Sequence, residues 1–309
     1  MKTLFILNPV AGHGRARRRW EGLIGSLRQA LPEMELWHTR GPGDGAALAR
    51  RGLEQSFEAL VAVGGDGTLG EVVDGFLSAP GPQRAGAAVG TWPAGSGCDT
   101  ARHLGLSMRD PATRLVAMLR ARRLQRLDAG RLLYTDDAGA TRSRHFINVA
   151  AFGLAGTVAR RLERSGKRWG GTASYLLSTL QALLSARPDP IELEVDGRPE
   201  PSVELFLGAV ANAASVGGGM LVAPGADMED GWLDLLTVGK RSRFQLLRTL
   251  PKVYRGEHLT APGVALRKVK RVVARAAGEV WLNVDGEALG KLPCVFEVLP
   301  RALPFLMPP

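Results

Sequence analysis

Residues 61–71 read Val-Ala-Val-Gly-Gly-Asp-Gly-Thr-Leu-Gly-Glu, and this stretch indicates the fold of the first half of the chain. The continuous apolar run Ala59–Val63 is typical of a strand buried on both faces of a parallel sheet. A strand that ends in glycines and leads into a helix, expected over Gly70–Ser78, presents backbone N–H groups to phosphate at the positive end of the helix. A plain tight turn would need the same glycines, so both interpretations stay open for this stretch alone.

Three glycines of this stretch, Gly65, Gly67 and Gly70, also satisfy GxGxxG and the protein-kinase form GxGxxGxV. A dinucleotide fold requires an acidic residue about 20 positions further on, and residues 85–93 contain none. The chain has neither the HRD nor the DFG tripeptide of protein kinases, and it lacks GxxxxGK[ST]. Dinucleotide-binding, protein-kinase and P-loop folds are therefore excluded.

The unusual residue in this loop is Asp66, a carboxylate where a bound phosphate would place negative charge. Like charges a few ångströms apart repel unless a divalent cation lies between them or the acid takes part in the chemistry. We interpret the loop as a site for a magnesium nucleotide rather than for bare phosphate, as phosphoryl transfer requires.

Two more glycine-rich turns support a composite site. Residues 8–14, Asn-Pro-Val-Ala-Gly-His-Gly, follow a predicted strand over Thr3–Leu7 and precede a basic helix. Residues 93–99, Pro-Ala-Gly-Ser-Gly-Cys-Asp, follow a predicted strand over 87–90 and also open a helix. Because the carboxyl ends of parallel strands share one edge of a sheet, we expect the three loops to meet there, where open α/β sheets bind ligands.

Strands and helices alternate up to about residue 125, which predicts an α/β domain with a parallel sheet. From there the chain changes to short segments rich in Val, Leu and Phe, which predict a β-rich second domain of sandwich-like or barrel-like form. The predicted strands of this half cover residues 142–149, 190–196, 203–211, 232–238, 266–275, 279–284 and 294–299. Two helices interrupt them, one over Thr172–Ser185 and one starting near Ser242.

The 309 residues include 40 Lys and Arg against 30 Asp and Glu, which gives a formal net charge of +10. This positive net charge predicts an anionic partner: nucleotide phosphates, nucleic acid or the surface of an anionic membrane. Nucleic acid is set aside because the chain carries no recognisable binding motif. The cysteines, Cys98 and Cys294, stand far apart and support neither a disulfide framework nor a structural zinc. With no apolar run long enough to span a bilayer, we expect a soluble, cytoplasmic protein.

Four blocks of sequence together resemble the diacylglycerol kinase catalytic-domain family, in particular its soluble bacterial lipid kinases. The blocks are Asn8-Pro9-Val10-Ala11-Gly12, Gly64-Gly65-Asp66-Gly67-Thr68, Pro93–Gly97 with Asp99 and Ala101-Arg102, and Asp285-Gly286-Glu287. Their order and spacing agree over nearly the whole chain. The second block is shared with NAD kinases and phosphofructokinases, so alone it indicates only the superfamily, and the other three narrow it.

The resemblance implies an ATP- and magnesium-dependent kinase of a lipid alcohol such as diacylglycerol. It implies a nucleotide domain over residues 1–125, to which residues 299–309 return, and a β-rich acceptor domain over 126–298, with the acceptor in the cleft between them. The ATP site would be lined by Asn8, Pro9, Val10, Ala11, Gly12, Thr39, Gly65, Asp66, Gly67, Thr68, Leu69, Gly70, Glu71 and Ser96. Asp66, Asp285 and Glu287 would be catalytic, with Glu287 as the general base. Asp230, with backbone groups of Asp227 and Trp232, would hold a structural magnesium ion.

Other interpretations of these residues stay open. Before the family is considered, Asp285-Gly286 is better explained as the turn of a β-hairpin, because Asp-Gly is the commonest such turn. Cys98 stands where the family usually has asparagine, which puts acceptor preference and turnover in question. The alternatives are a kinase of a soluble acceptor such as NAD and a catalytically weak lipid-binding protein. The sequence also leaves a homodimer open.

A lipid kinase must reach an acceptor that lies in a bilayer. Two segments combine aromatic and basic residues: Arg241, Arg243, Phe244, Leu247, Arg248, Leu250, Lys252, Tyr254 and Arg255, and then Arg164, Lys167, Arg168 and Trp169. Segments of this kind lie on anionic headgroups, which predicts peripheral contact with the inner face of the membrane. The solvated face of an ordinary packed helix explains the pattern equally well.

Overall fold

The structure, a computed structural model, describes residues 1–165 and 186–309. The chain forms two compact units: unit 1 is Met1–Leu127 with Arg301–Pro309, and unit 2 is Asp128–Pro300. The predicted helix over Thr172–Ser185 and the cluster around Trp169 lie outside the described residues. In the part of the chain that is described, every helix is too short or too polar to cross a bilayer.

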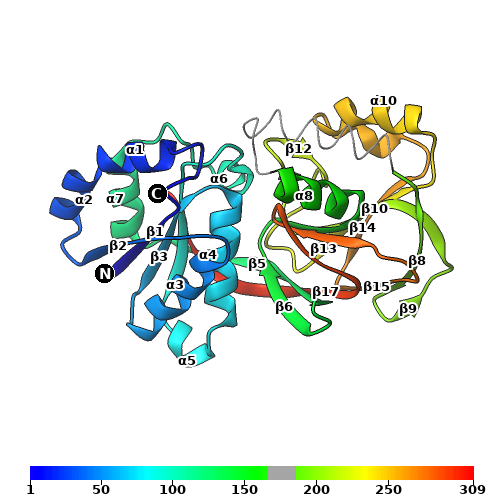
Figure 1. Ribbon diagram of the computed structural model, residues 1–309. Coiled ribbons are helices and arrows are strands. Elements are labelled where there is room, and N and C mark those ends of the chain that lie inside the picture. Colours follow the sequence, from blue (N-terminus) through cyan, green and yellow to red (C-terminus); the bar gives the residue numbers. More distant parts are fainter. Residues whose placement is uncertain (166–185) are drawn as a thin grey trace. The chain divides into compact units, whose positions relative to one another are not determined.

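Unit 1 is built on a parallel sheet with the strand order β4-β3-β1-β2 (Figure 1). Its strands are β1 (Thr3–Leu7), β2 (Met34–His38), β3 (Ala59–Gly64) and β4 (Ala88–Pro93). β1, β3 and β4 are buried along their whole length, as their continuous apolar sequences predict. The end of the chain joins the edge of this sheet, where Phe305 pairs with Val89 of β4.

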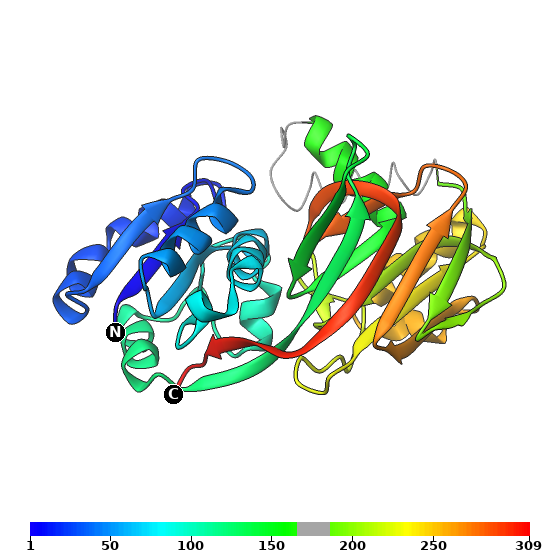
Figure 2. The same cartoon turned by 90° about the horizontal axis from the view of Figure 1, so that it is seen from below.

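Helices cover both faces of this sheet (Figures 1 and 2). They are α1 (Arg15–Glu21), α2 (Ile24–Ala30), α3 (Asp44–Glu54), α4 (Asp66–Ser78), α5 (Gly81–Arg84), α6 (Asp99–His103) and α7 (Ala112–Ala121). Trp20, Leu27 and Met118 bring α1, α2 and α7 into one core with the strands. On the other face α3 packs on α4, and Gly75 permits the close approach because a Cβ there would strike the backbone of Ala46.

Unit 2 is an antiparallel β structure whose strand pairings close a ring. β5 (Leu124–Thr135) begins in unit 1, and β17 (Glu287–Leu306) ends there. The elements between them are β6 (Thr141–Phe146), β7 (Val149–Gly153), α8 (Leu154–Ser165), β8 (Asp189–Val195), β9 (Arg198–Pro199), β10 (Val203–Ala211), β11 (Ser215–Val216), β12 (Met220–Leu221), β13 (Leu233–Gly239), α10 (Arg243–Val253), η1 (Glu257–Thr260), β14 (Val264–Val269), β15 (Arg271–Ala276) and β16 (Trp281–Val284). The pairings run from β10 through β8, β15, β17, β16 and β7 back to β10. Phe152, Leu282 and Phe296 lie in the core that these strands enclose.

The predicted fold class is confirmed, with differences in detail. α4 begins at Asp66, ahead of the predicted Gly70, so the aspartate lies in the first turn of the helix. The predicted strand over 142–149 is broken between β6 and β7, and the predicted strand over 266–275 is divided between β14 and β15. The start predicted near Ser242 is confirmed, because Ser242 caps α10 by accepting the N–H of Gln245 at 3.2 Å. The unit boundaries lie two residues beyond the expected 125 and 298.

Candidate active site

The three glycine loops of unit 1 are bonded to one another at the carboxyl edge of the sheet. Asn8 donates its backbone N–H to the carbonyl oxygen of Val63 at 3.0 Å and its side-chain Nδ2 to Oγ1 of Thr68 at 3.2 Å. The N–H groups of Ala94 and Gly95 donate to the carbonyl oxygen of Gly64 at 2.7 and 3.0 Å. The loop after β3 is therefore tied to the loop after β1 and to the loop after β4.

The carboxylate of Asp66 makes the second connection between these loops. Its Oδ2 accepts the N–H of Asp99 and its Oδ1 accepts the N–H of Thr100, both at 3.0 Å. These donors lie at the amino end of α6, where N–H groups lack helical partners. Burial raises the pKa of Asp66 above its ordinary value; the charge of Asp99 adds to this effect, and the two hydrogen bonds oppose it. The negative charge of Asp66 thus has protein donors, so a cation is not the only explanation for an acid in this loop.

Glycine is required where the loops touch. A Cβ at Gly12, whose φ is +58°, would lie 2.6 Å from the carbonyl oxygen of Ala94. A Cβ at Gly95 would strike the Cα of Gly65. The loops therefore pack backbone against backbone, and this arrangement lets main-chain N–H groups approach a phosphate closely.

Cys98 immediately precedes α6 in a left-handed conformation, with φ of 53° and ψ of 45°. Asparagine tolerates this conformation better than most side chains do, which agrees with the asparagine that the resemblance implies at this position. The thiol is buried and lies 3.7 Å from the carbonyl oxygen of Gly64. Burial and then the charge of Asp66 raise the pKa of Cys98 to about 11, so the thiol stays protonated at neutral pH.

We expect Cys98→Asn to stabilise unit 1 by roughly 0.5–1 kcal/mol, because the left-handed backbone costs asparagine less than cysteine. Urea unfolding measures the change, with Cys98→Ala as the control that removes the thiol without easing the backbone. If the asparagine variant proves less stable than the alanine variant, backbone conformation does not decide the preference at this position.

The other residues expected around ATP divide between surface and interior. Pro9, Val10, Ala11, Gly67 and Ser96 retain solvent exposure, whereas Thr39, Leu69, Gly70 and Glu71 are buried. Glu71 accepts the N–H of Gly43 at 2.8 Å and that of Gly45 at 2.7 Å. In the structure, then, the Glu71 carboxylate anchors the segment between β2 and α3, which begins at Thr39.

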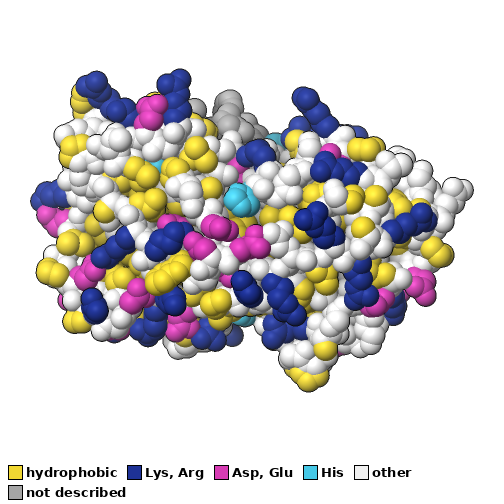
Figure 3. Space-filling model, turned by 180° about the vertical axis from the view of Figure 1, so that it is seen from behind, with side chains coloured by type: hydrophobic (Ala, Val, Ile, Leu, Met, Phe, Trp, Pro, Cys, Tyr) yellow, Lys and Arg dark blue, Asp and Glu magenta, His cyan; other side chains and the backbone are white. Residues whose placement is uncertain are grey.

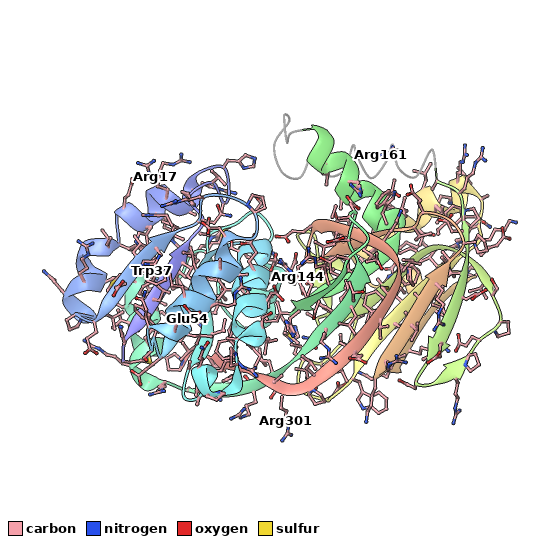
Figure 4. All side chains as sticks on the ribbon, turned by 60° about the horizontal axis from the view of Figure 1, so that its bottom comes forward. Arg17, Trp37, Glu54, Arg144, Arg161 and Arg301 are labelled. Carbon is pink, nitrogen blue, oxygen red and sulfur yellow. The ribbon has the colours of Figure 1, made fainter. Side chains whose placement is uncertain are left out.

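The sequence did not single out Arg19, which points inward from α1. Its guanidinium donates to the carbonyl oxygens of Pro93 at 3.0 Å and Asp110 at 2.6 Å, and it lies 4.9 Å from the ring centroid of Trp92. Arg17, on the same helix, instead pairs with Glu21 at 2.8 Å on the surface (Figure 4). Arg19 thus fixes the start of the third glycine loop, a role hidden among the neighbouring arginines.

In unit 2 the Asp285-Gly286 turn joins β16 to β17. Both residues have positive φ, 48° and 91°, as the hairpin interpretation requires. The Asp285 carboxylate accepts three backbone N–H groups, from Ile147 and Asn148 at 3.2 Å and from Val149 at 3.0 Å. Asp285 therefore fixes the hairpin against the break between β6 and β7.

Glu287, the first residue of β17, forms an ion pair with Arg144 of β6. Nη2 of Arg144, a residue labelled in Figure 4, lies 2.7 Å from Oε2 of Glu287. The arginine side chain is 13% exposed. The pair gives the negative charge of Glu287 a partner and restricts its position. The sequence offers little sign of this contact, because Arg144 and Glu287 are 143 positions apart.

The expected structural metal site lies just before β13. Asp230 accepts the N–H of Trp232 at 2.9 Å and Nζ of Lys268 at 2.5 Å, while Asp227 accepts the N–H of Glu229 at 3.0 Å. A carboxylate with backbone oxygens suits Mg²⁺ in ligand type, but Lys268 already supplies a cation to Asp230. Across residues 1–165 and 186–309, no three His, Cys, Asp or Glu side chains gather as metal ligands.

Comparisons with known proteins agree with this architecture. Residues 2–132 match the family described as diacylglycerol kinase catalytic domain, and residues 148–307 match the YegS C-terminal NAD kinase beta sandwich-like domain. The chain is 30% identical to a diacylglycerol kinase of Bacillus subtilis (strain 168) over 99% of its own length and 96% of the other. A solved structure from Bacillus anthracis str. Sterne superposes with a TM-score of 0.78 at 22% identity, over 100% of this chain and 95% of that one. Yeast NADH kinase, solved with NADH, gives 0.55 at 13% identity, over 99% and 82%.

Proposed function

The chain belongs to the diacylglycerol kinase family and is a phosphotransferase, and from this premise we propose an ATP- and magnesium-dependent kinase that phosphorylates the hydroxyl of a lipid such as diacylglycerol. The observation that best supports this activity is the set of hydrogen bonds that joins three glycine loops at one edge of a parallel sheet. Asp66 links two of these loops. A backbone-lined edge of this kind is suited to a polyphosphate.

In this proposal the glycine loops hold the triphosphate of ATP through main-chain N–H groups. Asn8 and Thr68, hydrogen-bonded at 3.2 Å, keep the first two loops in register. Asp66 is the side chain suited to hold magnesium there, because a carboxylate oxygen is a ligand that this ion prefers. When bound, magnesium would neutralise phosphate charge; Arg19 and Asp66 meanwhile keep the third loop in place.

In the proposed transfer step, Glu287 acts as the general base. The acceptor oxygen bonds to the γ-phosphorus, the bond from phosphorus to the β,γ-bridging oxygen breaks, and the hydroxyl proton passes to the Glu287 carboxylate. Asp285 sets the hairpin on which Glu287 stands, through its three backbone hydrogen bonds. Arg144, 2.7 Å from Glu287, orients the carboxylate.

The acceptor is tested by incubating the protein with γ-labelled ATP and a total lipid extract, and by separating the products by chromatography. We expect label in a chloroform-soluble phosphate monoester, and none with Asp66→Ala. Label that appears only when NAD replaces the lipid would favour the soluble-acceptor alternative. No ADP release with either acceptor would favour a lipid-binding protein without turnover.

We expect magnesium at Asp230 to compete with Lys268 for the carboxylate. Lys268→Gln removes the competing charge and should lower the magnesium concentration needed for stabilisation several-fold, whereas Asp230→Asn should abolish the effect. The thermal unfolding midpoint, followed as magnesium is added after chelation, gives the measurement. Lys291→Gln is the control, because its partner Glu279 lies outside this loop. Equal shifts in all the proteins would place the magnesium effect elsewhere.

We also propose peripheral membrane contact through α10, made by its exposed aromatic side chains. Leu247 and Leu250 pack against Leu246 and Phe206, whereas Phe244 is 66% exposed and Tyr254 is 48% exposed. Arg248 lies 5.5 Å from the ring centroid of Phe244. Two exposed aromatic side chains near cations suit the anionic inner face of a membrane.

Phe244→Ser with Tyr254→Ser should reduce flotation with phosphatidylglycerol vesicles at low salt about fivefold or more, because both rings lose their apolar contact with the bilayer. Val203→Ser is the matched control, since Val203 is an exposed apolar residue of β10 in the same unit. Flotation that is equal in all three proteins would contradict a role of α10.

A further inference from the structure

A second candidate site in unit 1 is a pocket lined by arginine. Its volume is about 460 Å³, and its wall carries four arginines and no acidic residue. We call it the arginine pocket and define it by Arg84, Arg122, Arg126 and Arg301. All of its lining residues belong to unit 1. The side chain of Arg301 extends away from the ribbon (Figure 4).

The arginine pocket is separate from the glycine loops. Its wall includes Ala87, which precedes β4, and Phe76, near the end of α4. The glycine loops, in contrast, follow the carboxyl ends of β1, β3 and β4, and the loop after β3 leads into the amino end of α4. A strand of six residues spans about 20 Å, so one phosphate group cannot contact both places.

The cationic charge of this pocket is only partly neutralised. Arg122 pairs with Glu58 at 3.2 Å and donates to the carbonyl oxygen of Gly86 at 2.7 Å. Within the described ranges the Arg126 side chain makes no hydrogen bond or ion pair, and Nε of Arg84 is buried without an acceptor. Like charges around one cavity repel each other, and an anion in the cavity would remove that repulsion.

Cationic side chains elsewhere are more evenly balanced. Lys and Arg are spread over the face in Figure 3, with Asp and Glu among them. Several surface cations have direct partners, as in the Arg267–Glu200 and Lys240–Glu204 pairs, both at 2.7 Å. A pocket wall with four arginines and no acid is therefore a local feature and not a consequence of net charge alone.

The chemistry of the wall indicates the class of ligand. Guanidinium groups present paired N–H donors that match phosphate oxygens. Phe76, Leu124 and Pro304 add apolar surface, and Leu124 is 44% exposed. We propose that the arginine pocket binds a phosphate monoester that carries an apolar group.

Isothermal titration with dihexanoyl phosphatidic acid, below its micelle concentration and with a non-hydrolysable ATP analogue present, tests this site. We expect one equivalent of dihexanoyl phosphatidic acid to bind in the presence of the ATP analogue. The affinity for this lipid should fall at least tenfold in Arg84→Ala/Arg126→Ala. The single variant Arg126→Ala, at an exposed side chain without partners, should show part of the loss with the fold intact. Arg28→Ala/Arg50→Ala removes the same charge from exposed positions outside the pocket and should leave binding unchanged.

A parallel titration with inorganic phosphate distinguishes two sources of the bound phosphate group: a lipid phosphate and free phosphate. Tighter binding of the lipid phosphate, lost in Leu124→Ser while inorganic phosphate binding persists, assigns the site to an amphiphile. Equal binding of both probes, sensitive to Arg84→Ala/Arg126→Ala, assigns it to free phosphate. Binding that is unaffected by Arg84→Ala/Arg126→Ala, or reduced as much by Arg28→Ala/Arg50→Ala, would overturn the proposal. Since only binding is measured, the outcome does not depend on the proposed kinase activity.

Discussion

The Glu287→Gln variant should lose about three orders of magnitude in kcat while binding ATP with unchanged affinity. Glutamine keeps the size of the side chain and its contact with Arg144, but it cannot take the proton of an attacking hydroxyl. A positioned general base contributes roughly 10²–10⁴-fold to a rate. ADP release with a short-chain diacylglycerol measures kcat, and titration with the ATP analogue measures nucleotide binding.

A matched control separates base catalysis from the loss of an ion pair. Glu279→Gln breaks an exposed pair of the same kind, with Lys291 at 2.7 Å, in the same unit, and it should leave kcat unchanged. Loss of a general base should leave at most about a hundredth of the activity. If Glu287→Gln retains more than about a tenth of it, another group accepts the proton. The Asp285-Gly286-Glu287 segment would then be only the hairpin turn that its sequence also suggests.

The sequence was most informative where local chemistry decides the structure. The bounds of β1 and the start of α10 follow from apolar runs and from a Ser242–Gln245 capping box, both of which depend on neighbouring residues. The glycine loops could be placed at one sheet edge because parallel strands impose that geometry. Cys98 could be singled out only through the resemblance, which implies asparagine at this position; the left-handed backbone that favours asparagine is visible only in the structure.

Contacts between distant positions could not be predicted in the same way. The strand predicted over 142–149 is broken where the N–H groups of Ile147, Asn148 and Val149 turn to Asp285, about 140 residues later in the chain. No local propensity encodes a carboxylate that arrives from another hairpin. For the same reason the sequence gives no sign that the Glu71 carboxylate accepts the N–H groups of Gly43 and Gly45. Local sequence patterns do not predict which side chains contact residues far away in the sequence.

Asp66→Ala should inactivate the protein by at least about 10³-fold and lower its free energy of unfolding by roughly 2–4 kcal/mol. The stability loss follows because the N–H groups of Asp99 and Thr100, both buried residues, lose their acceptor, and each unsatisfied buried donor costs about 1–3 kcal/mol. Urea unfolding and ADP release give the two values. Asp44→Ala is the control, because Asp44 also lies in the first turn of a helix but accepts the exposed N–H of Arg40.

Asp66→Asn then separates the structural role of the carboxylate from its proposed role at the nucleotide. An amide oxygen can still accept one of the two N–H groups, so this variant should be more stable than Asp66→Ala yet equally inactive if charge is required.

The pH dependence of stability has a defined sign: the pKa of Asp66 is raised in the folded protein, so the native state binds this proton more readily than the unfolded chain. The stability of the unchanged protein relative to Asp66→Asn must then fall as pH rises from the ordinary aspartate pKa through the folded one. Urea unfolding of both proteins from about pH 4 upward follows this change, because the ordinary aspartate pKa is about 3.9. A difference that grows in favour of the unchanged protein would mean that the backbone donors of α6 outweigh burial, and Asp66 would then be primarily a helix cap.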